Sequence, residues 1–102
     1  MANIKEQDAA VNMLPNARLT AAQVINSVFS DGAYANIALG KALSKQNHSE
    51  QDRRFVTELV YGTVKAKGTI DWLLQQLVSR PLGKIEPMIL NILRLGGFQI
   101  YF

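Results

Sequence analysis

The sequence predicts an all-α fold, a bundle of about five helices. Apolar residues recur at helical spacing in five successive segments of the chain. No segment shows the sustained alternation of a strand, and no Asn-Gly or Asp-Gly turn joins two apolar runs. The composition is that of an ordinary globular protein, with 48% apolar and 19% charged residues. At 102 residues, the chain forms at most one domain, which buries roughly 65% of its unfolded surface.

The first two helices are bounded by capping residues. Residues 1–15 carry few periodic apolar positions and are expected to be a flexible leader, which leaves residues 16–102 as the domain. Asn16 suits the N-cap of the first helix, and Gly32 suits the left-handed residue that ends it. A second helix is predicted over about residues 34–46, before a polar break.

The third helix is predicted over residues 52–65, with Ser49 as a capping residue before it. Its polar face carries residues that are four, three and four positions apart: Arg54, Glu58, Tyr61 and Lys65. Arg54 and Glu58 are spaced for a surface ion pair. Gly62 costs about 1 kcal/mol relative to Ala inside a helix, which indicates close packing against another backbone or RNA.

The fourth helix is expected to be capped by Thr69 and to end at Arg80-Pro81, because a residue before proline is pushed out of helical geometry. Trp72, near its start, is expected to be a partly buried core or staple residue. Pro87 suits the first turn of a fifth, largely apolar helix, which the adjacent glycines 96 and 97 are expected to bend.

The chain ends in an apolar segment without a stop signal, so we expect a domain that is truncated at its C-terminus or covered there by another subunit. Self-association as a homodimer is one expectation, because exposed aromatic area favours association. The residues expected to take part are Ile92, Leu95, Phe98, Tyr101 and Phe102.

Catalytic and metal sites are not indicated. The absence of cysteine excludes disulfides, thiolate zinc sites and cysteine nucleophiles. His48, the single histidine, is expected to be a solvated loop residue, and Glu50 and Asp52 suit the first turn of a helix better than acid–base chemistry. The polar N-terminus lacks a signal core and residues 88–102 are too short to span a bilayer, so we expect a cytoplasmic protein without a membrane partner.

A phosphate-rich partner is the binding hypothesis that the charges favour. The formal net charge is +3, which permits nucleic-acid binding without demanding it. If the first and third helices pack side by side, their cations could form one basic patch; a merely solvated face is the alternative. The candidate RNA-binding residues are Arg18, Arg53, Arg54, Tyr61, Lys65 and Lys67.

The ordered motifs of the chain resemble a known family over roughly residues 16–102. The most specific blocks are Arg53-Arg54-Phe55 with Tyr61-Gly62-Thr63, and Ile92-Leu93-Arg94-Leu95-Gly96. Weaker matches are Gly32-Ala33-Tyr34-Ala35-Asn36, Ile70-Asp71-Trp72-Leu73-Leu74 and Pro81-Leu82. Together they resemble the N-terminal domain of bacterial small-subunit rRNA cytosine-C5 methyltransferases of the RsmB (Sun/Fmu) type, which is similar to the antitermination factor NusB.

This resemblance implies a NusB-like helical fold that positions rRNA for a separate methyltransferase domain, which is the chain's other expected partner. That catalytic domain, with its S-adenosylmethionine site and catalytic cysteines, is expected to be absent from this chain, so we expect no cofactor and no activity here. Lys65 stands where the family usually has Arg, which weakens a bidentate phosphate contact. The alternatives are a NusB-like antitermination factor or protein–protein module, and a purely structural domain.

Overall fold

The computed structural model describes residues 16–102, which form five α-helices and one short 3-10 helix without any strand. The helices are α2 (Asn16–Asp31), α3 (Ala35–Lys45), α4 (Glu50–Lys65), α5 (Lys67–Leu77) and α6 (Pro87–Tyr101), and η1 (Leu82–Lys84) precedes α6. The all-α prediction is confirmed. The predicted leader, residues 1–15, lies outside the described residues.

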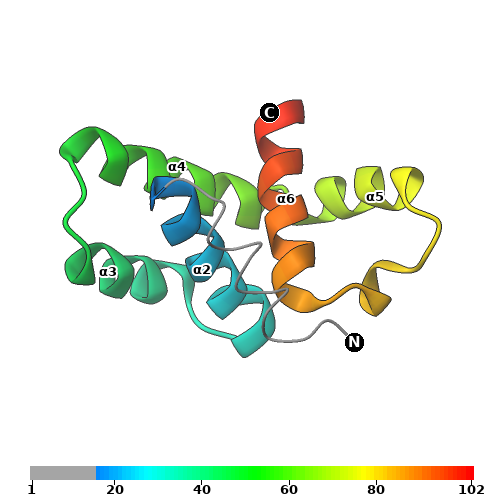
Figure 1. The fold of residues 1–102 in the computed structure, drawn as a ribbon, viewed down its shortest axis with the longest axis horizontal. Helices are drawn as coiled ribbons and strands as arrows, with labels where there is room; N and C mark the ends of the chain where they lie inside the picture. Colours follow the sequence, from blue (N-terminus) through cyan, green and yellow to red (C-terminus); the bar gives the residue numbers. More distant parts are fainter. Residues whose placement is uncertain (1–15) are drawn as a thin grey trace.

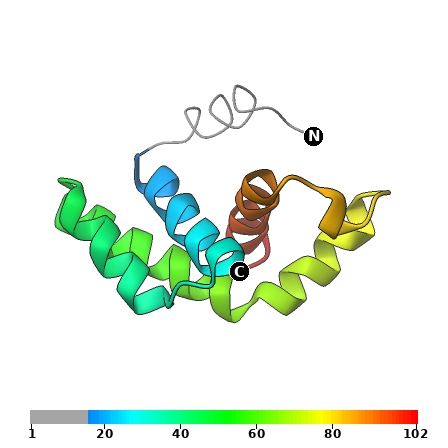
Figure 2. The same ribbon diagram turned by 90° about the horizontal axis from the view of Figure 1, so that it is seen from below.

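The helices are arranged around α2 and α6. Figure 1 shows α4 and α5 running in line along one side of the molecule, with α6 crossing them near their junction. Seen from below, α4 and α5 meet at an angle and α2 and α6 lie on the inner side of that angle (Figure 2). The main packing partner of α4 is α2, and that of α5 is α6. One side of the α4–α5 pair therefore faces the core and the other faces solvent.

Three of the capping signals act where expected, whereas Asn16, the predicted N-cap, is itself the first residue of α2. Gly32, with φ of 75°, has the left-handed conformation that ends α2. The Ser49 hydroxyl accepts a hydrogen bond from the Asp52 backbone N–H at 3.1 Å, which caps α4. Pro87 occupies the first turn of α6, and the Glu86 carboxylate caps that helix through the Ile89 N–H at 3.1 Å.

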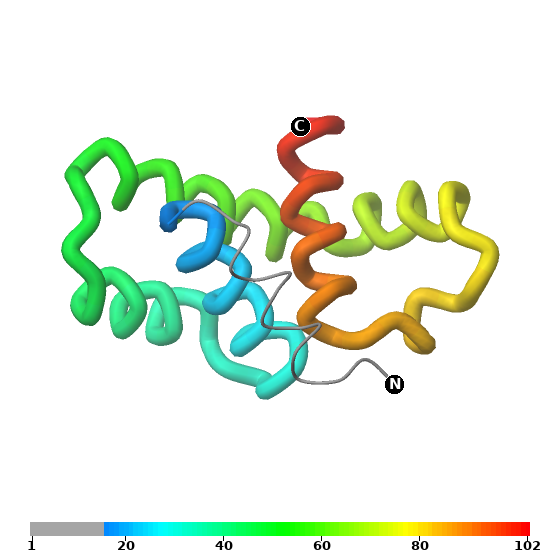
Figure 3. The backbone as a smooth tube through the Cα atoms, in the orientation of Figure 1, coloured from blue at the N-terminus to red at the C-terminus, as the bar shows by residue number. Residues whose placement is uncertain are grey.

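The fourth helix differs from its prediction at both ends. It begins at Lys67, not after a Thr69 cap, because Ala66 is a single turn residue whose N–H still donates to the Gly62 carbonyl at 3.0 Å. The tube in Figure 3 shows how directly α4 leads into α5. Helix α5 ends at Leu77, before the Arg80-Pro81 boundary, and the Gln75 side chain stabilises the connection by donating to the Arg80 carbonyl.

Two apolar clusters form the core. The larger joins α2, α3, α4 and α6, and the smaller joins α5 to α6. Fully buried members of the larger cluster are Ala21, Ala22, Ile25, Val56 and Val60, and the smaller consists of Ile70, Leu74 and Leu90. Gly62 packs against the Phe98 ring of α6, so the close approach expected there is to an aromatic side chain.

Several residues of the last helix take part in this core. Leu95 is buried, and Ile92 and Phe98 pack partly buried against the larger cluster. These three residues are therefore covered at least in part by their own domain, and self-association through the last helix stays a prediction. Tyr101 and Phe102 remain exposed, and α6 runs through Gly96-Gly97 as one helix.

His48 is also placed differently from its prediction as a solvated residue. It is half-buried in the loop between α3 and α4, with Nε2 at 2.9 Å from the Thr20 hydroxyl oxygen. The Thr20 hydroxyl donates to the Gln46 side-chain oxygen at 2.8 Å, and Thr20 itself is fully buried. These contacts attach the loop to α2, which gives His48 a structural role.

Candidate nucleic-acid interface

The six predicted RNA-binding residues are distributed over three helices, α2, α4 and α5. Helices α2 and α4 do pack side by side, as the single-patch hypothesis requires. Arg53 and Arg54 nevertheless lie near the start of α4, whereas Lys65 is its last residue. At 1.5 Å per residue, Arg53 and Lys65 are roughly 18 Å apart along the helix. The structure therefore does not bring these cations into one patch.

Arg18 is engaged in packing between helices. Its guanidinium carbon lies 5.2 Å from the centre of the Phe55 ring, within the range of a cation–π contact. Its Nε donates to the side-chain oxygen of Gln99 at 3.3 Å. Arg18 is half-buried and joins α2 to α4 and α6, which leaves less of its guanidinium for an outside phosphate.

The two arginines at the start of α4 are exposed and have partners within the domain. Arg53 donates through Nη1 to the Leu43 carbonyl at 2.9 Å, near the C-terminal end of α3, where the helix dipole favours a cation. Arg54 forms an ion pair with Glu50 at 3.4 Å, not with Glu58 as the spacing predicted. Because the two side chains are 77% and 84% exposed, this pair contributes at most a few tenths of a kcal/mol.

The surroundings of these two arginines are acidic. A surface hollow of about 780 Å³ is lined there by six residues, of which three are carboxylates and one is a cation: Glu50, Gln51, Asp52, Arg54, Phe55 and Glu58. Residues 46–58 carry three acidic and two cationic side chains, for a net charge of −1. Because the carboxylates repel phosphate, this end of α4 is poorly suited to RNA.

The other end of α4 presents an aromatic residue and a cation to solvent. Tyr61 is 44% exposed, and Lys65, one turn later, is also exposed. Trp72 on α5 is 64% exposed, so its prediction as a core or staple residue is wrong. Ile70 and Leu74 occupy the inner side of α5, and Trp72, two residues from each of them, lies on the opposite side.

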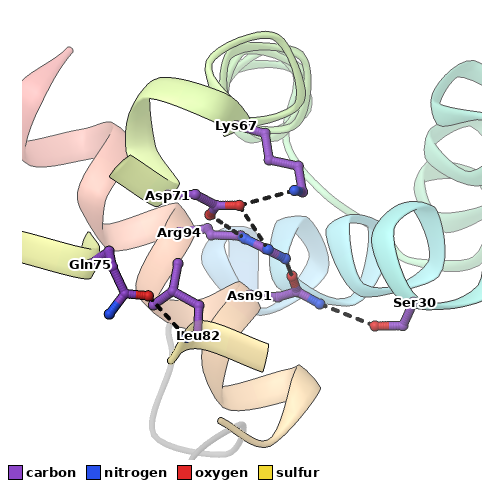
Figure 4. A network of polar contacts seen from close by, with 7 residues as sticks. All are labelled: Ser30, Lys67, Asp71, Gln75, Leu82, Asn91 and Arg94. Carbon is purple, nitrogen blue, oxygen red and sulfur yellow. Dashed lines mark hydrogen bonds and ion pairs between the residues drawn. The ribbon is translucent and has the colours of Figure 1, made fainter. Parts of the chain in front are cut away.

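Lys67 belongs to a polar network that the sequence did not reveal (Figure 4). Its ammonium group lies 2.9 Å from Asp71 Oδ2, and the same carboxylate accepts two hydrogen bonds from Arg94, at 2.7 and 3.0 Å. Arg94 also donates to Asn91 Oδ1 at 2.8 Å, and Asn91 Nδ2 contacts Ser30 at 3.4 Å. The network connects α5, α6 and α2.

The electrostatics of this network are those of a structural ion pair. The side chain of Arg94 is 10% exposed and that of Asp71 is 21% exposed. Burial by itself raises the pKa of Asp71, but the hydrogen bonds and positive charges of Arg94 and Lys67 together hold that pKa below its ordinary value. Arg94 and Lys67 also lie 5.1 and 5.5 Å from the centre of the Phe29 ring. One signal was present in the sequence: Asn91 and Arg94 interrupt a largely apolar run.

Within residues 16–102, no three His, Cys, Asp or Glu side chains are arranged to hold a metal ion. In the same part of the chain, none of the helices is both long and apolar enough to cross a bilayer.

Comparison with known proteins assigns this fold to a family. The model of the NusB family matches residues 15–102. The chain belongs to the NusB family. The match includes all five helices described above, so the NusB-like bundle predicted from the motifs is confirmed. No solved structure matches the chain significantly.

The curated relatives are named as methyltransferases. A probable ribosomal RNA small subunit methyltransferase B of Synechocystis is 39% identical over 87 residues, which cover 85% of this chain and 20% of the relative. A putative methyltransferase of Mycobacterium tuberculosis is 36% identical over 87 residues, covering 85% of this chain and 19% of the relative. A further probable ribosomal RNA small subunit methyltransferase B, from Bacillus subtilis, is 34% identical over 70 residues, covering 69% of this chain and 15% of the relative. The chain thus spans a fifth or less of the length of these relatives.

Proposed function

We propose that this chain is the RNA-binding module of a small-subunit rRNA cytosine-C5 methyltransferase and that it positions rRNA for a separate catalytic domain. The observation that carries the proposal has two parts. The chain matches the NusB family over residues 15–102, and it aligns with about a fifth of the length of relatives that are named as rRNA methyltransferases. Most of the length of each relative lies outside this match, which leaves room there for the catalytic chemistry. We expect the module to work in the cytoplasm and to contact its own methyltransferase domain.

The proposed mechanism is electrostatic capture followed by orientation. Lysine and arginine side chains neutralise phosphates and release counterions, while the rigid helices fix the direction in which the RNA leaves the surface. The charge distribution supports the end of α4 that carries Lys65 as the main contact, because three carboxylates, Glu50, Asp52 and Glu58, lie around Arg54 at the other end. Arg18, Arg53 and Lys67 have partners within the domain and are expected to contribute less.

The methyl donor belongs to the proposed catalytic domain. S-adenosylmethionine is the cofactor expected there, whereas the present chain has no cysteine to serve as a nucleophile toward a cytosine ring. We therefore expect isothermal titration calorimetry of the chain with S-adenosylmethionine to give no saturable heat. Saturable binding would contradict the proposed division of roles.

Salt-dependent RNA binding tests the proposal directly. The anisotropy of labelled small-subunit rRNA fragments is measured against chain concentration at several salt concentrations. We expect Lys65→Gln to reduce the log–log salt slope by about 0.7 for single strands. Arg54→Gln is the matched control, because the local charge there is negative, and it should leave the slope nearly unchanged. No binding at low salt would overturn the proposal, and binding to a ribosomal protein in place of RNA would support the antitermination-factor alternative.

A further inference from the structure

The solvent side of the α4–α5 pair carries two exposed aromatic residues with a cation between them. Tyr61 and Lys65 are four positions apart, about one turn of α4, and Trp72 lies on the side of α5 opposite the buried Ile70 and Leu74. The helices change direction at Ala66, where the Ala66 N–H donates to the Gly62 carbonyl and the Ile70 N–H donates to the Ala66 carbonyl, at 3.0 and 2.9 Å. Both helices turn their buried sides toward α2 and α6, on the inner side of the angle between them (Figure 2). The three side chains therefore share one face, which we name the aromatic face.

The surface between Lys65 and Trp72 is open to a ligand. Gly68 and Thr69, which lie between Lys65 and Trp72, are both exposed, and a Cβ added to Gly68 would meet nothing within 4 Å. Tyr61 and Trp72 lie 11 residues apart, which corresponds to roughly 16 Å along the helices. Two ring systems at this separation can each contact a different base of one strand.

The charge of the surrounding segment suits a polyanion. Residues 59–85 contain four cationic and one acidic side chain, for a net charge of +3, which equals that of the whole chain. The acidic residue is Asp71, whose charge is already balanced by Arg94 and Lys67. The positive charge of the domain therefore accumulates on the segment that also exposes Tyr61 and Trp72.

We infer that the aromatic face is a binding track for single-stranded RNA, in which Trp72 and Tyr61 stack on unpaired bases and Lys65 contacts a phosphate. Exposed aromatic rings combined with positive charge are the features by which proteins bind single strands, since every base offers a face for stacking. A duplex keeps its bases stacked inside and offers these rings nothing comparable. The inference rests on the proposed RNA-binding function and adds the strandedness of the ligand and the role of Trp72.

The fluorescence of Trp72 can report on binding without a label, because Trp72 is the only tryptophan of the chain. A base that stacks on the indole quenches its fluorescence. We expect an unlabelled single-stranded oligonucleotide to quench the emission of the chain along the same saturation curve that anisotropy of the labelled strand gives. A duplex of the same sequence should quench weakly. Equal quenching by strand and duplex, or saturable binding without quenching, would overturn the track.

Substitution at Trp72 separates stacking from packing. Stacking of one base typically changes affinity by roughly 5- to 150-fold, so we expect Trp72→Leu to weaken single-strand binding within this range. Trp72→Phe, which keeps an aromatic face, should retain most of the affinity, and Tyr61→Leu should weaken it. Tyr34→Leu is the control, because Tyr34 is 75% exposed but stands before α3.

The outcomes distinguish this inference from the function on which it rests. If no RNA binds at low salt, the proposed function fails. If RNA binds but the Trp72→Leu and Tyr34→Leu variants bind equally well, the track fails while the function stands. Because Trp72 is exposed, Trp72→Leu should unfold with the wild-type thermal midpoint, and a large drop in that midpoint would contradict its placement on the surface.

Discussion

Asp71 is predicted to be the most sensitive polar position of the domain. The Asp71→Asn substitution removes the negative charge that faces Arg94 at 2.7 and 3.0 Å and Lys67 at 2.9 Å. Breaking a buried pair by removing one partner costs about 3–5 kcal/mol, because the other charge stays buried. Asp71 is 21% exposed and Arg94 keeps its bond to Asn91, so we expect a smaller loss of about 2–4 kcal/mol in the free energy of unfolding. This is a large share of the stability of a domain of this size.

Denaturant unfolding followed by far-ultraviolet circular dichroism measures this loss. We expect the midpoint of Asp71→Asn to fall while the slope with denaturant stays unchanged. Arg94→Met should cost less, because Met replaces the apolar stem and Asp71 keeps Lys67 as a partner. The double variant should show a coupling energy of about 1–3 kcal/mol between the two residues.

The control for this experiment is the exposed ion pair of Arg54 with Glu50. Arg54→Gln should change the free energy of unfolding by at most about 0.5 kcal/mol, as expected for a surface pair. If Asp71→Asn lowers the free energy of unfolding no more than Arg54→Gln, the Asp71–Arg94 ion pair does not stabilise the fold and its burial is not energetically important.

The same ion pair predicts a dependence of stability on pH. The folded-state pKa of Asp71 lies below its ordinary value, so the unfolded chain binds the proton more readily. The stabilisation is therefore present above the unfolded-state pKa of about 3.9 and is lost as the pH falls through the folded-state value. The unfolding midpoints of wild type and Asp71→Asn should converge in acid. Curves that stay parallel down to acid pH would contradict this assignment.

Three further substitutions test the packing and the surface charge. Gly62→Ala would place a Cβ against the Phe98 ring and should lower the free energy of unfolding by about 1–3 kcal/mol, measured by thermal or denaturant unfolding. Gly40→Ala is the control, because a Cβ there would meet nothing within 4 Å, and it should raise the free energy of unfolding by about 0.5–1 kcal/mol. Equal effects of the two substitutions would contradict the Phe98 contact. Thr63 buries a hydroxyl that has no hydrogen-bond partner within residues 16–102, so Thr63→Val should unfold at the same or higher denaturant concentration, and a loss above about 1 kcal/mol would reveal a partner. Glu58→Gln removes a carboxylate one turn before the aromatic face, so it should raise RNA affinity about twofold at low salt. High salt should abolish this gain, because it screens exposed charges. Unchanged affinity at low salt would mean that the RNA binds elsewhere on the domain.

The sequence alone predicted the five α-helices of residues 16–102, because periodicity and capping act locally. The left-handed glycine at position 32, the hydroxyl of Ser49 and the ring of Pro87 each act within a few residues, so their effects could be predicted without knowing the tertiary structure. The start of α5 could not, because a change of direction at Ala66 that keeps its hydrogen bond to Gly62 leaves no break in the pattern. A capping residue such as Thr69 is then available but not used.

The candidate site was predictable only in part, for a related reason. Periodicity correctly places Tyr61 and Lys65 on the solvent face of α4, since that depends on spacing within one helix. The partner of each cation depends instead on contacts between helices: Arg53 meets a carbonyl of α3, and Lys67 meets Asp71 and Phe29. A basic patch predicted from the sequence alone therefore includes cations that already have partners within the folded domain.

The exposure of Trp72 follows from which side of α5 packs against α6. A Cβ added to Gly97 would lie 3.1 Å from an Ile70 methyl carbon, so the two helices meet through a glycine and an aliphatic side chain, with little space between them. Asp71, the next residue after Ile70, reaches Arg94 at the edge of the same contact. Trp72 is two residues from both Ile70 and Leu74, which face α6, so it lies on the opposite side of α5, where Tyr61 and Lys65 of α4 are also exposed. The buried ion pair and the exposed aromatic face are thus two consequences of one helix packing, and neither can be inferred from the residue types alone.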